Sequence, residues 1–395
     1  MINKCFLGAR FCNDAFVASC LEMKKFNFSA GPGVLPPPVL KKVQEEFLDY
    51  ANTGSSVCEI SHRSKEFKAC LSKAQNDFRS LLDIPSGYKV LFMQGGASSQ
   101  FSAVIYNMVV DLTQPVDYIV TGAWSDKAAQ EAKRLGANVN VVFNSKPSKH
   151  NGDIPEVSSM SFSKNPAFIY YCDNETVHGV EMPVGWVDQL PSNVPIVCDM
   201  SSNFLSRPVD ISKYAIIFGG AQKNIGPAGV TIVIVRDDLL GRFDKSPLSG
   251  PLMLDYKICA ENDSMYNTPP CFPIYVSGLV FQWLLDIGGL SKMNEINLEK
   301  AGRLYQTLAN YPQHFSFPVI KEKYRSRMNV PFRVCKNGIP DEALEKQFLS
   351  GAESVGCFSL AGHRSVGGMR ASLYNALESD AIDALVNFIE KWVQQ

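Results

Sequence analysis

The stretch IIFGGAQKNIGPAG, Ile216 to Gly229, decides how the rest of the chain is interpreted. An apolar run typical of a buried strand ends at two glycines, Lys223 follows, and the chain becomes apolar again at VTIVIVR. Burying an unpaired ammonium is costly, so a lysine at such a position tends to lose its proton or to find a partner. A neutral lysine is a nucleophile for carbonyl carbons. The stretch therefore predicts a buried strand whose end presents a reactive amine.

Short apolar runs of the same kind recur before and after this stretch. They are KVLFM (89–93), DYIVT (117–121), AFIYY (167–171), VPIVC (194–198), AIIFG (215–219) and VTIVIV (230–235). Several are separated by helix-like segments, such as SDKAAQEAKRLG (125–136), for which we predict a serine N-cap and a glycine stop. Continuous apolar strands between helices predict an α/β fold with a mostly parallel, mixed sheet covered by helices on both faces.

The pattern changes after residue 275, where long helical stretches lead into a shorter α+β region. The last of these helical stretches, SDAIDALVNFIEKWV, is amphipathic. We therefore predict a large sheet domain over residues 23–275 and a smaller C-terminal α+β domain over 276–395, which can also collect the first residues of the large domain.

Residues 1–22 do not resemble the remainder, and we treat them as an N-terminal extension. They are poor in acids, as organelle-targeting segments are. However, Lys4 and Arg10 are their only basic residues, and Asp14 and Glu22 count against targeting. We expect a cytoplasmic protein and keep organelle targeting as the alternative.

The composition is that of an ordinary globular protein. The chain has 395 residues, is 46% hydrophobic and carries a net charge of -1, so nothing favours nucleic acid as the main partner. It lacks an apolar run long enough to span a membrane. The 11 cysteines show no CxxC pair and no zinc-ligand spacing, which predicts reduced thiols and no metal site.

Ligands of open α/β sheets bind beyond the carboxyl ends of the strands. Five apolar runs are followed there by the loop QGGASSQ (94–100), Trp124, Thr176, Asp199 and Lys223. Each has an ordinary explanation on its own, since an aspartate after a strand commonly caps a turn and a lone lysine commonly faces solvent. Together they converge on one edge of one sheet, which predicts a binding site.

The five features suit pyridoxal phosphate (PLP), a phosphorylated aromatic aldehyde. The GGASS segment offers backbone N–H groups at a helix N-terminus for a phosphate, and Trp124 offers a flat face for stacking. Asp199 can keep a ring nitrogen protonated by charge pairing. Lys223 supplies the amine that forms a Schiff base with the aldehyde, and its flanking glycines let the backbone approach the cofactor closely.

Eight motifs together resemble the phosphoserine aminotransferases, a family of fold-type I, class V PLP-dependent transaminases. They are NFSAGPGVLPPPVL, ISHRSKEF, QGGASSQF, NETVHGVE, CDMSSNFLSRPVD, GAQKNIGPAG, YNTPPCFPIY and GHRSVGGMRASLYNA, in the family's order from about residue 25 to residue 395. One motif departs from the pattern: many members have GGGxGQF in the phosphate loop, where this chain has GGASSQF. Backbone donors and a serine hydroxyl remain available there.

The resemblance implies a role for individual residues. Lys223 is the Schiff-base lysine, Asp199 pairs with the pyridine nitrogen, and Trp124 stacks on the ring. The further cofactor contacts that it implies are Ala97, Ser98, Thr176 and Gln222, with Asn267 and Thr268 reaching the cofactor phosphate of a partner subunit. The resemblance thus implies a homodimer with shared active sites.

The family's substrates have two anionic ends. The resemblance implies reversible amino transfer between glutamate and 3-phosphohydroxypyruvate in serine biosynthesis, giving 2-oxoglutarate and O-phosphoserine. Arginine suits both carboxylate and phosphate through its planar fork. Arg370 is assigned to the carboxylate, and the pairs His62–Arg63 and His363–Arg364 to the phosphate, with the partner subunit as a candidate source of one pair.

Other functions stay open at this point. Another class V enzyme is one alternative, either a serine–pyruvate or alanine–glyoxylate transaminase or a cysteine desulfurase using Cys357 or Cys335. A non-catalytic PLP-binding regulator is a second, but it usually carries a DNA-binding domain, and no basic helix-turn-helix stretch is present. A nucleotide-binding protein using GGASS is a third. It lacks GxGxxG and GxxxxGK[ST], and it leaves Lys223 and Asp199 unexplained.

Overall fold

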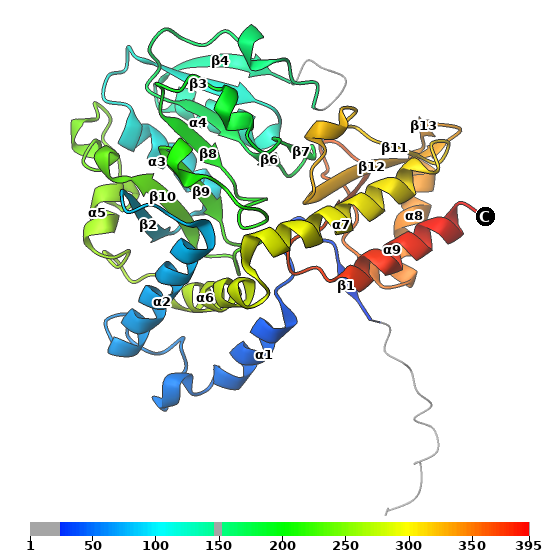
Figure 1. Ribbon diagram of the computed structural model, residues 1–395, viewed down its shortest axis with the longest axis horizontal. Helices are drawn as coiled ribbons and strands as arrows, with labels where there is room; N and C mark the ends of the chain where they lie inside the picture. Colours follow the sequence, from blue (N-terminus) through cyan, green and yellow to red (C-terminus); the bar gives the residue numbers. More distant parts are fainter. Residues whose placement is uncertain (1–23, 146–151, 395) are drawn as a thin grey trace, which may run out of the picture.

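The computed structural model describes residues 24–145 and 152–394, so the N-terminal extension predicted over 1–22 lies outside the described residues. A large α/β part and a smaller part lie side by side, and the long helix α7 (Gly289–Ala309) runs from one to the other (Figure 1). The predicted domain boundary near residue 275 falls within helix α6 (Cys271–Asp286), and that division of the chain stays a prediction.

The large part is built on a seven-stranded sheet. Its strands, in spatial order, are β2 (Tyr88–Met93), β10 (Thr231–Arg236), β9 (Ile216–Gly220), β8 (Ile196–Asp199), β5 (Ile169–Cys172), β3 (Pro115–Val120) and β4 (Asn138–Asn144). Strand β10 runs antiparallel to both neighbours, whereas the pairs from β9 to β4 are parallel. The predicted α/β fold with a mostly parallel, mixed sheet is therefore confirmed.

Alternation of side chains along each strand supplies two cores, one on each face of the sheet. In β10, Ile232 and Ile234 enter one core, while Val233 and Val235 enter the other. Because both faces are covered, the strand sequence is apolar at every position instead of alternating with polar residues. The runs that the sequence analysis identified are apolar for this reason.

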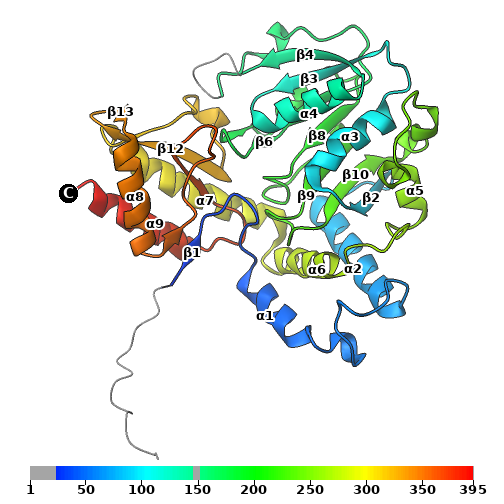
Figure 2. The ribbon, with the colours of Figure 1, turned by 180° about the vertical axis from the view of Figure 1, so that it is seen from behind.

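Helices from different parts of the chain cover the two faces (Figures 1 and 2). Helices α2 (Lys65–Leu82) and α6 contribute to the first core, and α1 (Pro37–Glu46) packs against α6. Helices α3 (Gly96–Met108), α4 (Ala123–Arg134) and α5 (Tyr256–Glu261) contribute to the second core.

Helix α4 corrects one expectation. It begins two residues before Ser125, with Gly122 at the N-cap, so the predicted serine N-cap is wrong. Ser125 lies in the first turn instead, where its Oγ accepts hydrogen bonds from the N–H groups of Thr121 and Gly122. Strand β4 was not anticipated, because its Asn-rich sequence NVNVVFN lies half-buried at the edge of the sheet.

The smaller part contains short strands and the last helices. They are β11 (Phe315–Ser316), β12 (Asn329–Lys336), β13 (Ile339–Pro340), β14 (Cys357–Phe358), β15 (Met369–Ser372), α8 (Glu342–Ser354) and α9 (Ser379–Trp392). The N-terminal strand β1 (Phe26–Asn27) joins this part by pairing with β14, and Phe28 is buried in its core. The two ends of the described chain thus build one substructure.

Two features of the described residues concern membranes and metals. No single helix there has the length and apolar character to cross a membrane, although α6 and α7 together reach that composition as a pair bent by 85°. In the same residues, no group of three or more His, Cys, Asp and Glu side chains is placed to hold a metal ion.

Candidate active site

A cavity of about 340 Å³ lies at the carboxyl ends of the parallel strands. Nine of the residues predicted from the sequence line it: Ala97, Ser98, Trp124, Thr176, Asp199, Gln222, Lys223, His363 and Arg370. They come from both parts of the molecule. Arg370 belongs to the antiparallel sheet of the smaller part, and His363 lies in the loop that precedes its strand. The structure thus brings most of the predicted site together.

Lys223 follows strand β9, and its side chain is buried. Its Nζ atom donates a 2.8 Å hydrogen bond to Oγ1 of Thr176 and lies 5.6 Å from the centroid of the Trp124 ring. Burial lowers the pKa of the Lys223 amine, an effect that the negative charge of Asp199 opposes. The site therefore favours the neutral, nucleophilic form of this lysine.

Asp199 is the last residue of strand β8 and is also buried. Its Oδ1 atom accepts a 2.8 Å hydrogen bond from the N–H group of Ser201. Burial raises the pKa of Asp199, whereas the Ser201 hydrogen bonds and the charge of Lys223 lower it. A buried carboxylate in this setting gains from a cationic partner, such as a protonated ring nitrogen.

Trp124 lies in the first turn of α4, and its indole Nε1 is buried without a hydrogen-bond partner. An unpaired buried donor that lines a cavity is a group that a ligand can satisfy. The exposed Lys127, one helical turn further on, places its Nζ atom 4.4 Å from the Trp124 ring centroid. The sequence analysis did not single out Lys127, because a lysine on a helix surface is ordinary in sequence.

The loop before helix α3 supplies free backbone donors. Gly95 and Gly96 have φ values of +92° and +64°, and α3 begins there without a side-chain cap. A Cβ atom at Gly95 would lie 1.9 Å from Oγ of Ser99, so only glycine fits. Ala97 and Ser98 therefore present N–H groups to the cavity edge, which suits a phosphate even though the motif reads GGASSQF.

Arg370 is the main cation inside the cavity. It belongs to β15, its Nη1 lies 3.4 Å from the carbonyl oxygen of Thr176, and its Nε is buried without a partner. Burial lowers the pKa of Arg370. His363 lines the cavity and Arg364 follows it in the chain, and both side chains are exposed. Partial burial together with the charges of Arg370 and Arg364 lowers the pKa of His363.

Five predicted residues do not line this cavity: Arg364, which follows His363, and His62, Arg63, Asn267 and Thr268. His62 and Arg63 precede α2, and Asn267 lines a separate small crevice beside β2 and α5. The carbonyl oxygen of Thr268 accepts a hydrogen bond from Nε2 of Gln94, next to the phosphate loop. The proposed roles of the last four involve a partner subunit, and those assignments stay predictions.

The structure brings further polar residues to the site. Asn174 lines the cavity, and its amide donates to Ser202 and to Asn329, while its Oδ1 atom has no partner. Ser201 and Ser202 also line it. The NET and DMSS motifs that contain these residues were noted, but a single polar residue in such a motif gives no signal of its own.

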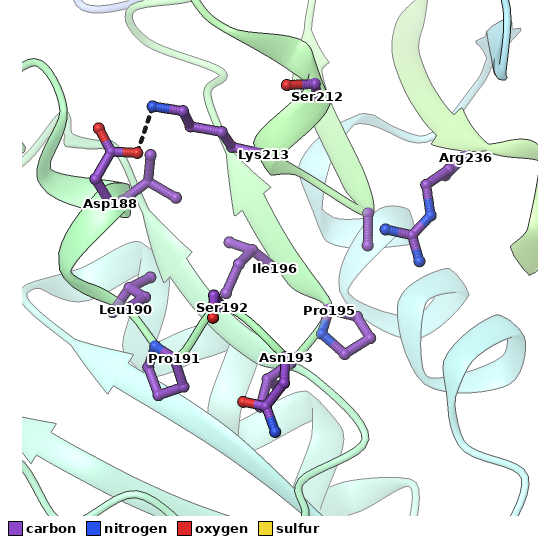
Figure 3. Close-up of a pocket in the computed structure, with 13 residues that line it drawn as sticks. Asp188, Leu190, Pro191, Ser192, Asn193, Pro195, Ile196, Ser212, Lys213 and Arg236 are labelled. Carbon is purple, nitrogen blue, oxygen red and sulfur yellow. Dashed lines mark ion pairs between the residues drawn. The ribbon is translucent and has the colours of Figure 1, made fainter.

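A second cavity, of about 450 Å³, lies at the amino ends of the parallel strands, where β8 and β9 begin (Figure 3). It holds two cationic side chains. Lys213 forms an ion pair with Asp188, and Arg236 forms one with Asp238 at 2.5 Å. Both cations are already paired, and apart from Asp188 the other lining residues are uncharged. The reactive side chains therefore lie in the first cavity.

Comparison with known proteins gives consistent matches. The family model described as aminotransferase class-V matches residues 25–385. The phosphoserine aminotransferase of Ectopseudomonas mendocina is 48% identical over 375 residues, covering 95% of this chain and 99% of that relative.

Solved structures match equally well. The phosphoserine aminotransferase of Bacillus circulans subsp. alkalophilus is 40% identical with a TM-score of 0.86, and the match covers 94% of this chain and 99% of that one. The PLP-bound phosphoserine aminotransferase of Trichomonas vaginalis is 40% identical with a TM-score of 0.85, covering 93% and 100%.

Proposed function

The chain belongs to the class V aminotransferase family, and on that premise we propose that it is a PLP-dependent phosphoserine aminotransferase. It transfers the amino group of glutamate to 3-phosphohydroxypyruvate and forms O-phosphoserine and 2-oxoglutarate, in the direction of serine synthesis. The observation that carries the proposal is the buried Lys223 amine between Thr176 and the Trp124 ring, with the Asp199 carboxylate in the same cavity.

The residues of the cavity fit PLP. Its buried polar atoms without partners, Nε1 of Trp124 and Oδ1 of Asn174, are groups that a bound ligand can satisfy. Lys223 would attach the aldehyde, Asp199 would face the ring nitrogen, and the start of α3 would hold the phosphate, with Thr176 and Gln222 as further contacts. When bound, PLP supplies a protonated ring that draws electrons from the carbon that loses its proton.

The chain's own groups then perform the remaining steps. Lys223, as a neutral amine, would take the proton from Cα of the amino substrate and deliver it to the C4′ carbon of PLP in the same half-reaction, and the second half-reaction would run this transfer in reverse. Asp199 would pair as a carboxylate with the protonated ring nitrogen, and Trp124, which lines the same cavity, would cover one face of the ring. Thr176 holds the Lys223 amine by the 2.8 Å hydrogen bond.

Substrate selection rests on cations around the cavity. Arg370 offers its free Nε for the substrate carboxylate, and His363 at the cavity would bind the phosphate together with the adjacent, exposed Arg364. Glutamate would place its side-chain carboxylate where the phosphate lies. We assign His62, Arg63, Asn267 and Thr268 to the neighbouring active site of a homodimer, in line with their absence from this cavity.

The alternative functions find less support. The two candidate cysteines of a desulfurase, Cys335 and Cys357, are buried in strands of the small part, and burial raises the pKa of Cys357 to about 11. Neither lines the cavity. The cysteines in the described residues are free thiols, which suits the cytoplasmic location that we propose.

A transaminase assay tests the proposal. Purified protein is given glutamate with 3-phosphohydroxypyruvate, and 2-oxoglutarate is measured, alongside alanine with glyoxylate. The proposal predicts a clear preference for the phosphorylated substrate. Borohydride treatment followed by peptide mapping should place the reduced cofactor on Lys223. Faster turnover of alanine with glyoxylate, or label on another lysine, would contradict it.

A further inference from the structure

Glu175 is a buried carboxylate that the reaction itself does not use. It follows Asn174 in the short strand β6 (Asn174–Glu175) and is 0% exposed. Its Oε2 accepts a 2.9 Å hydrogen bond from the N–H of Trp124. Its Oε1 accepts a 2.9 Å bond from the N–H of Ser125 and a 2.6 Å bond from Oγ of Ser125. Both carboxylate oxygens thus accept hydrogen bonds from Trp124 and Ser125 in the first turn of α4.

These hydrogen bonds replace a local helix cap. The first N–H groups of a helix have no partner within the helix, and a nearby side chain usually accepts from them. The N-cap of α4 is Gly122, which has no side chain to do so. A Cβ atom at Gly122 would lie 2.5 Å from Cδ of Glu175, so the glycine leaves the space that the carboxylate fills.

The same segment holds the other parts of the cavity. Thr176, the next residue, accepts from Nζ of Lys223, and its carbonyl oxygen lies 3.4 Å from Nη1 of Arg370. Asn174, the preceding residue, donates to Ser202 and Asn329. The backbone of Glu175 is therefore fixed relative to the amine, and its side chain transmits that position to Trp124.

We propose that Glu175 is a positioning residue that sets the Trp124 ring relative to Lys223 through the start of helix α4. This inference rests on the proposed function, because the ring matters as the surface that covers the cofactor. It predicts that Glu175 controls PLP affinity and turnover although it does not line the cavity.

The geometry makes glutamine an informative replacement. In Glu175→Gln the amide NH₂ must take the place of one carboxylate oxygen, where it meets an N–H donor instead of accepting from it. The Ser125 side already carries two donors, so the less costly orientation turns the NH₂ toward the N–H of Trp124. The substitution therefore acts at Trp124 while keeping the size of the side chain.

Two measurements on E175Q test the proposal. In the cofactor-free protein, hydrogen exchange of the Trp124 and Ser125 amides should accelerate at least tenfold, because their acceptor is lost or displaced. The dissociation constant for PLP should rise about tenfold. Wild-type rates and affinity in E175Q would overturn the inference. Failure of the wild-type protein to bind PLP would instead overturn the proposed function.

Glu181 provides the matched control. Glu181 belongs to strand β7 (Val180–Glu181), which pairs with β6 to form one two-stranded ribbon. It is also buried, but its carboxylate accepts hydrogen bonds from Arg327 instead of from α4. E181Q should lower stability and leave both amide exchange at Trp124 and PLP affinity within twofold of wild type. Equal effects of E181Q and E175Q would mean that Glu175 acts only through general stability, which would overturn the inference.

A double-mutant cycle separates positioning from direct contact. If Glu175 acts through the ring, E175Q should change PLP affinity less than twofold once Trp124 is replaced in W124A. A tenfold rise in the PLP dissociation constant when E175Q is added to W124A would overturn the inference. Should E175Q fail to fold, E175D decides the question. It keeps the charge with shorter reach, and its PLP affinity should fall between wild type and W124A, whereas an affinity equal to wild type would count against positioning.

Discussion

The Nζ atom of Lys223 donates a 2.8 Å hydrogen bond to Oγ1 of Thr176, so the threonine hydroxyl fixes the position of the amine in the cavity. Thr176→Val keeps the shape and removes the acceptor. We expect kcat/KM to fall about tenfold, because the buried amine loses its partner. Steady-state kinetics of T176V against T176S check this, and T176S should retain most activity. A kcat/KM of T176V equal to that of the wild type would show that the hydrogen bond does not contribute to turnover.

Arg370 is expected to bind the substrate carboxylate through its free Nε. R370Q should raise KM for glutamate and lower kcat/KM by about 10- to 100-fold, since hydrogen bonds to charged groups are worth about 1.5–3 kcal/mol. The kcat/KM of R370K should fall between those of the wild type and R370Q, because lysine keeps the charge but loses the planar guanidinium fork. PLP affinity of R370Q should remain close to wild type. A loss confined to PLP binding would contradict the assignment to substrate.

Glu181 makes the stability of the protein sensitive to acid. Burial alone would raise the pKa of Glu181, but the charges of Arg327 and Arg207 and the hydrogen bonds of Arg327 lower it to about 2. Because the folded-state pKa lies below the usual value of 4.5, this carboxylate stabilises the fold above pH 4.5, and the contribution is lost as pH falls toward 2.

The size of that contribution is on the order of 2–3 kcal/mol. Urea unfolding of wild type and E181Q between pH 6 and about pH 3 measures it. The free-energy difference between the two proteins should shrink as the pH falls. A difference that stays constant over this range would rule out the depressed pKa as the cause.

Lys300 holds the turn that follows β15. Its buried Nζ donates to the carbonyl oxygens of Leu373, Tyr374, Asn375 and Leu377 at 2.9–3.4 Å. Lys300→Met would leave these acceptors unsatisfied and should lower the free energy of unfolding by about 2–4 kcal/mol. The exposed Lys292 on the same helix offers a control, since K292M should change stability by less than about 0.5 kcal/mol.

Part of the site could be predicted because its signals are local in sequence. Lys223 and Asp199 each end an apolar run, and the rule that ligands bind at the carboxyl ends of parallel strands places both at one edge. The strand runs themselves are visible because burial on both faces makes them continuously apolar. The roles of Arg370 and His363 came from the resemblance, not from any physical pattern.

The rest depends on contacts between distant segments. The cap of α4 comes from Glu175, far along the chain, so the local sequence suggested Ser125 instead. Strand β4 lacks a continuous apolar run because only part of it is covered. His62 and Asn267 do not line the cavity, and their assignment to a partner subunit stays a prediction.

The pairing of β1 with β14 has a consequence for biosynthesis. The N–H of Phe26 donates to the carbonyl oxygen of Gly356, and the carbonyl oxygen of Phe28 accepts from the N–H of Ser372. On a translating ribosome, β1 and the apolar ring of Phe28 therefore cannot gain these partners until the segments that contain Gly356 and Ser372 have been synthesised. A chain that terminates before Ser372 would lack the N–H group that binds the carbonyl oxygen of Phe28, and we expect such a chain to be degraded by cellular quality control.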